Sequence, residues 1–145
     1  MMSTPADSRT AARRLIEALP RPLPRNDGRR ADAVQAALLA SGLLDRRDLG
    51  NSRAVAAATR DGLTILAHLL DENAPGHGAG QLLLLLLAER DGFTPHPAPD
   101  EAQLRARDTA TGLLHLALWH TDNELRLVSA ALQVHAEEAL LADRP

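Results

Sequence analysis

The sequence contains no cysteine, tyrosine or lysine, and only one tryptophan and one phenylalanine. Without cysteine the chain cannot form disulfides, use a thiol nucleophile or bind a metal through thiolates. With so few aromatic residues it has little material for the aromatic-lined pockets that small ligands favour. Every basic residue is arginine, as a GC-rich coding sequence would produce, so we give arginine-specific recognition little weight.

Long apolar stretches are also missing. The longest apolar run, residues 82–88, is far too short to span a bilayer. The first residues, MMSTPADSRTAARR, contain no apolar stretch of the signal-peptide type. We therefore expect a cytoplasmic bacterial protein that has no membrane partner.

What the chain does contain is leucine and alanine in quantity. Its 145 residues are enough for one domain with a real core. Isoleucine and valine, which favour strands, are scarce, whereas leucine and alanine favour helices. We predict an all-α fold, a compact bundle or orthogonal array of five to six helices with no sheet.

Apolar residues at helical spacing give the expected helices, over residues 8–19, 30–44, 52–60, 63–72, 81–91, 100–119 and 124–141. Asn51 or Ser52 is a credible N-cap, and Gly62 either separates two helices or lies within a single one spanning residues 52–72. The proline-rich stretch from Pro20 to Gly28 excludes a helix. It predicts an N-terminal arm, residues 1–28, and a helical domain, residues 29–145. The helix of this arm either docks on the domain, through Leu15, Ile16 and Leu19, or is mobile.

Two stretches nearly repeat each other, RDGLT from Arg60 and RDGFT from Arg90. The segment that begins at Gly50 resembles the outline of an ankyrin repeat, which would imply a protein-binding scaffold without catalysis. The Arg-Asp pairs at Arg60, Arg90 and Arg107 are 30 and then 17 residues apart, however, whereas ankyrin units recur about every 33 residues. We therefore interpret both stretches as helix C-caps, with Gly62 and Gly92 at positive φ.

The run QLLLLLLAERD has no polar residue between Gln81 and Glu89, and a helix that is apolar all round is buried in a domain or in a subunit interface. The lone tryptophan is an expected core or interface anchor. No phosphate-binding loop or nucleophile motif is present, so no catalytic residue and no cofactor is predicted. We favour a non-enzymatic protein of regulatory or adaptor type that associates with itself, as a homodimer, or with another protein. The interface candidates are Leu82, Leu84, Leu85 and Trp119.

One alternative is a regulator that binds DNA. Residues 1–53 carry ten arginines and six acids, whereas residues 54–145 carry six arginines and thirteen acids. Residues 36–63 loosely resemble the core of a winged-helix protein. That resemblance implies that Arg53 and Arg60 face the groove and that Arg46 and Arg47 contact phosphates. The competing interpretation is that these arginines only keep a helix rich in leucine and alanine soluble.

A second alternative is a metal site built from histidines and carboxylates. His68 with Glu72, and His135 with Glu138, are four and three residues apart, which places each pair on one helix face. A mixture of histidine and carboxylate ligands suits zinc or iron. A solvated ion pair on a helix surface explains each pair equally simply.

Overall fold

The computed structural model describes residues 5–71 and 77–120, with side chains described for residues 9–71 and 77–116. Within this part all regular secondary structure is helical and no strand occurs, which confirms the predicted all-α fold without a sheet. The predicted helix at residues 124–141 lies outside the described residues. The elements are α1 (Pro5–Ala18), α2 (Asp27–Ser41), the short 3-10 turn η1 (Arg46–Asp48), α3 (Ser52–Leu70), α4 (Gly78–Asp91) and α5 (Glu101–His120).

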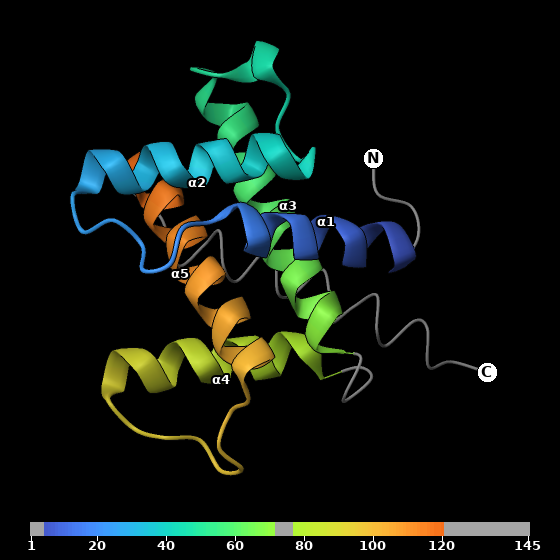
Figure 1. Ribbon diagram of the computed structural model, residues 1–145, viewed down its shortest axis with the longest axis vertical. Coiled ribbons are helices and arrows are strands. Elements are labelled where there is room, and N and C mark those ends of the chain that lie inside the picture. The colour runs from blue at the N-terminus through green and yellow to red at the C-terminus, as the bar shows by residue number, and fades with distance from the viewer. Residues whose placement is uncertain (1–4, 72–76, 121–145) are drawn as a thin grey trace.

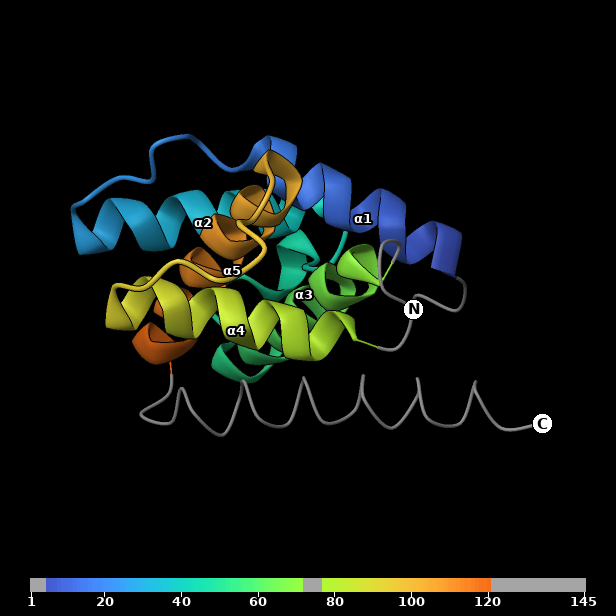
Figure 2. The same cartoon turned by 90° about the horizontal axis from the view of Figure 1, so that it is seen from below.

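The helices form an orthogonal array (Figures 1 and 2). In Figure 1, α3 and α5 run along the long direction of the molecule and pack against each other, while α2 crosses one end of this pair and α4 crosses the other. The first helix, α1, packs against both α2 and α3. None of the helices in residues 5–71 and 77–120 is both long and apolar enough to cross a membrane.

The core draws on all five α-helices. In α1, Leu15 is fully buried and Ile16 is half-buried against the same cluster, and Leu19, directly after the helix, is nearly fully buried. The expected arm therefore begins with a helix that is packed into the common core. The fully buried leucines are Leu15, Leu38, Leu63, Leu66, Leu82, Leu85, Leu113 and Leu116.

Two helices end at a glycine in the left-handed region. Gly92 has φ 76° and follows α4, and the Phe93 N–H donates to the Ala88 carbonyl at 3.1 Å, so the predicted C-cap is confirmed. Gly42 has φ 85° and ends α2 in the same way. The expected end of that helix at residue 44 was therefore wrong by three residues, because Gly42 leaves the helical region before Leu43 is reached.

The C-cap predicted at Gly62 is wrong. Gly62 lies inside α3, which runs without a break from Ser52 to Leu70, so residues 52–70 form one helix. At its start, the Asn51 side chain accepts from the N–H groups of Arg53 and Ala54, which confirms one of the two expected caps.

The starts of two other helices differ from expectation. α2 begins at Asp27, inside the stretch expected to be non-helical, because the Asn26 side chain accepts from the Arg29 N–H at 3.1 Å and caps the helix early. α4 begins at Gly78, within the loop expected to reach Gly80. The start of α2 is therefore set by a local cap, whereas Gly78 at the start of α4 packs against Ala67 and Asp71 at the end of α3.

Candidate functional site

The histidine and carboxylate pairs give no metal site that the structure describes. Of the four predicted ligands only His68 lies in the described part of the chain, half-buried on α3, while Glu72, His135 and Glu138 lie outside it. Within residues 5–71 and 77–120, no three histidine or carboxylate side chains converge to hold a metal ion. His115 has a structural position, with its Nε2 atom 3.2 Å from the Asp27 carbonyl oxygen at the start of α2.

The four arginines of the DNA-binding alternative are all exposed, Arg46 and Arg47 on η1 and Arg53 and Arg60 on α3. Asp45 accepts from the Arg47 backbone N–H at 3.0 Å and from its guanidinium at 3.1 Å, and these hydrogen bonds lower the pKa of Asp45. The short turn η1 stands where a helix-turn-helix protein has a full helix.

The leucine run of α4 divides between two sides. Leu82 and Leu85 are 0% and 1% exposed and belong to the domain core. Leu83 and Leu84, in contrast, are 42% and 39% exposed. Leu87 is half-buried and lies one turn after both, so Leu83, Leu84 and Leu87 form an outward surface, the α4 leucine face. Of the two alternatives expected for this run, burial of all its leucines within the domain is therefore wrong, and burial in a subunit interface stays a prediction.

The other predicted interface residue, Trp119, lies in the last turn of α5, where side chains fall outside the described part of the chain. Two further large apolar side chains are exposed in the described residues, Leu49 after η1 and Phe93 after α4. They follow different elements at opposite ends of Figure 1, so they do not form one patch.

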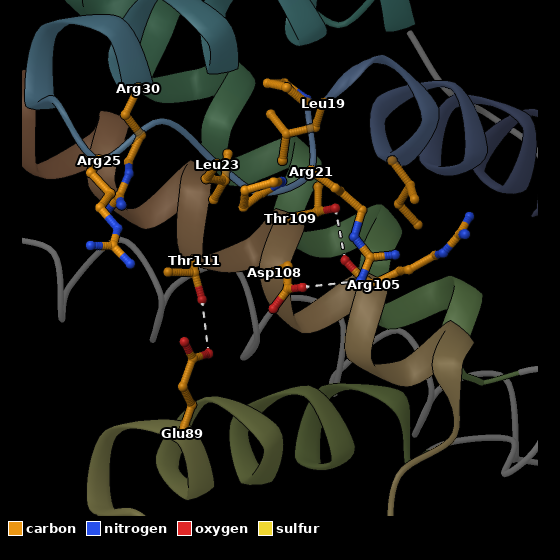
Figure 3. Close-up of a pocket in the computed structure, with 13 residues that line it drawn as sticks. Leu19, Arg21, Leu23, Arg25, Arg30, Glu89, Arg105, Asp108, Thr109 and Thr111 are labelled. Atoms are coloured by element: carbon orange, nitrogen blue, oxygen red, sulfur yellow. Dashed lines mark hydrogen bonds and ion pairs between the residues drawn. The ribbon is translucent and has the colours of Figure 1, made fainter.

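An open pocket of about 320 Å³ lies where the segment between α1 and α2 meets α5 (Figure 3). Three alternating prolines keep this segment out of a helix. Gly112 lets neighbouring elements pack closely on α5, since a Cβ atom there would lie 3.1 Å from Val34 and 3.6 Å from both Leu19 and Leu23. One wall of the pocket is apolar. The charged residues that line it are Arg21, Arg25, Arg30, Glu89, Arg105 and Asp108.

Both carboxylates of the pocket are bound by one arginine that does not line it. Arg107 places Nε 3.1 Å from Glu89 Oε2 and a terminal guanidinium nitrogen 2.8 Å from Asp108 Oδ1. The other oxygen of Asp108 is 3.5 Å from the Arg21 guanidinium. This network joins α4 to α5 and to the segment before α2.

The pocket was not predicted from the sequence, where the exclusive use of arginine is what a GC-rich coding sequence would produce. Its arginines come from positions as distant as Arg21 and Arg105, and only the fold brings them together. The sequence feature that could have indicated the pocket is the alternation of arginine and proline in PRPLPR, within the basic first third of the chain.

Comparison of the chain with known protein families, curated proteins and solved structures found no match.

Proposed function

We propose that this chain is a non-enzymatic helical protein of the cytoplasm that acts by protein–protein association and forms a homodimer through the α4 leucine face. The observation that carries the proposal is the adjacent pair Leu83 and Leu84, exposed by 42% and 39% on a helix whose buried side is already filled. A surface helix normally presents polar residues outward. Single exposed leucines are common, but consecutive ones on an apolar helix mark a surface that is stabilised by being covered.

A second copy of the chain is the occupant that this surface favours. The exposed charges one turn beyond the α4 leucine face, Arg90 and Asp91, pair with each other and leave no net charge with which to select a different partner. An apolar stripe can pair with its own copy under a twofold rotation. Gly80 is exposed one turn before Leu83 and Leu84 and has open space around it. It therefore permits the close approach of a second helix. Fully burying one of these exposed leucine side chains in the interface would stabilise the dimer by about 1.5–3 kcal/mol.

The nucleic-acid alternative is less favoured. Arg46, Arg47, Arg53 and Arg60 are exposed, but aspartates stand beside them in the sequence, at positions 45, 48 and 61. Those carboxylates reduce the local positive charge on which sequence-independent binding to phosphates depends.

Light scattering on a size-exclusion column, over a dilution series at constant salt, tests the homodimer. We expect a dimer at micromolar concentration and above, and a monomer for Leu84→Glu, because dimerisation would bury the added carboxylate. Ala40→Glu is the control, since it adds the same charge to an exposed position of α2. Circular dichroism checks that both variants fold.

A wild-type chain that stays monomeric over the whole series would refute the homodimer. A dimer that persists in Leu84→Glu would place the interface elsewhere and refute the assignment to the α4 leucine face. Equal loss of the dimer in Leu84→Glu and Ala40→Glu would attribute the effect to added charge, and would count against the assignment in the same way.

A further inference from the structure

The pocket between the α1–α2 segment and α5 carries more positive charge than its own carboxylates balance. Four arginines and two acids line it. Both acids, Glu89 and Asp108, are already bound by Arg107, whose charge adds to the same cluster from outside the lining. The excess of positive charge stands out in a chain whose formal net charge is −3.

Two of the four arginines form ion pairs with acidic residues. The Arg105 guanidinium lies 3.1 Å from Glu101, its ion-pair partner one turn earlier on α5, and the Arg21 guanidinium lies 3.5 Å from Asp108. These residues contribute to the positive potential of the pocket, but their own guanidinium groups are engaged.

The other two arginines, Arg25 and Arg30, have no ion-pair partner among the side chains that the structure describes, those of residues 9–71 and 77–116. Arg30 is half-buried, and its Nε–H donates to the Pro24 carbonyl at 2.8 Å. That bond uses one donor and holds the group in place, leaving the terminal nitrogens of Arg30 for another acceptor.

Figure 3 shows Arg25 and Arg30 together on one side of the pocket, above Thr111, with Glu89 below. Thr111 has an acceptor of its own, since its hydroxyl lies 3.0 Å from the Arg107 carbonyl and 3.3 Å from Glu89 Oε2. Two neighbouring guanidinium groups repel each other, and an anion between them removes that repulsion and forms charge-assisted hydrogen bonds.

The rest of the lining limits what such an anion can be. Ile16, Leu19 and Leu23 give the pocket an apolar wall beside the arginines. A volume of about 320 Å³ is at the small end of ligand pockets. These features favour a compact ligand with a charged end and an apolar end over a bare ion or a polymer.

We propose that this pocket binds a small organic dianion, a phosphate monoester or a dicarboxylate. Its charged group lies between Arg25 and Arg30, and its apolar part contacts Leu19 and Leu23. This site is independent of the α4 leucine face, so it stands whether or not the chain dimerises.

Isothermal titration calorimetry of the full chain at constant ionic strength tests the site, with phenyl phosphate, inorganic phosphate and succinate as probes. We expect saturable binding of phenyl phosphate, tighter than that of inorganic phosphate because of the apolar wall. Tighter binding of succinate than of phenyl phosphate would assign the site to dicarboxylates, and the reverse order to phosphate monoesters. Arg25→Gln and Arg30→Gln are each expected to weaken binding about tenfold, the loss of one charge-assisted contact.

Arg29→Gln is the matched control, because it removes the same charge from the first turn of α2 at a residue that does not line the pocket. Arg25→Gln is the decisive variant, since Arg25 supports no described contact and its loss leaves the fold intact, as thermal unfolding would verify. Absence of saturable binding by all three probes overturns the proposal. Equal weakening in Arg25→Gln and Arg29→Gln also overturns it, by showing only a response to net charge.

Discussion

Leu113 of α5 packs against Gly62 of α3, between the two central helices of the array. A Cβ atom at position 62 would lie 2.9 Å from Leu113 Cδ1 and 3.4 Å from Leu15 Cδ2. Leu15 and Leu113 are both fully buried. The missing side chain of Gly62 therefore sets how closely α3 and α5 approach each other.

Gly62→Leu is expected to lower the free energy of unfolding by about 1–3 kcal/mol, measured by urea denaturation, because it overpacks this contact. Gly62→Ala should change stability by less than about 1 kcal/mol, since the gain in helix propensity offsets a small displacement of the end of Leu113. Gly80→Ala is the control, with no neighbouring atom within 4 Å in the single chain; because Gly80 lies beside the α4 leucine face it is compared in the Leu84→Glu background, where it should stabilise by about 0.5–1 kcal/mol. A Gly62→Leu variant as stable as the wild type would contradict this packing.

A reciprocal capping box begins α5. The Asp100 N–H donates to Gln103 Oε1 at 2.9 Å, and the Gln103 N–H donates to Asp100 Oδ1 at 2.8 Å. Asp100→Ala should lower the free energy of unfolding by about 1 kcal/mol. Glu101→Ala, which removes only an exposed ion pair with Arg105, should cost less than about 0.5 kcal/mol. Equal losses in the two variants would show that the cap is not what stabilises this helix start.

Arg107 joins α4 to α5 through Glu89 and also binds Asp108. Arg107→Gln should destabilise the fold by about 1 kcal/mol in chemical denaturation, since two carboxylates then lose the same cation. The loss should shrink as salt is added. The control is Arg90→Gln, because within the described part of the chain Arg90 pairs only with its exposed neighbour Asp91 and should contribute nothing measurable. Comparable losses for the two arginines would rule out a special contribution from the Arg107 network.

The ionisation of the Asp61 carboxyl group makes the stability of the fold depend on pH. The residue as a whole is exposed, but partial burial of its carboxyl group on α3 raises its pKa, against the opposing charge of Arg60. A folded pKa above the unfolded one means that the ionised form destabilises the fold, and that this cost disappears as pH falls through the folded pKa. Asp61→Asn should therefore raise the melting temperature at neutral pH, with the gain vanishing below the ordinary value of 3.8.

Asp91→Asn is the control of opposite sign. A side-chain hydrogen bond from Arg90 lowers the pKa of Asp91, so this substitution should not stabilise the protein at neutral pH. If Asp61→Asn gave the same gain at pH 3 as at pH 7, a cause other than ionisation would be responsible.

The two near-identical pentapeptides show how far local sequence determines this fold. Gly92 ends its helix as predicted, because the prolines that follow Phe93 and Thr94 prevent continuation. Gly62 does not, because apolar residues at helical spacing resume at once and the contact with Leu113 stabilises an unbroken α3. That contact joins residues 51 positions apart, so periodicity within either segment could not predict it.

The pocket could not be predicted from the sequence, for a similar reason. The helical pattern predicted that α5 has an apolar stripe, but not that the turn of the chain after α1 lies against it. A hydrogen bond to the Pro24 carbonyl holds the Arg30 side chain in position, and Gly112 allows Leu23 to approach α5. Only the alternation of proline and arginine was visible beforehand.

The position of α5 as the last of the five described helices affects how the chain folds during synthesis. Leu113 covers Gly62, Arg107 pairs with Glu89, and α5 contacts every other α-helix of the core. Residues 5–91 therefore emerge from the ribosome with leucine faces that α5 has not yet covered, at a synthesis rate of about 5–20 residues per second. The native core, to which Leu113 and Leu116 of α5 belong, can close only once α5 has been made.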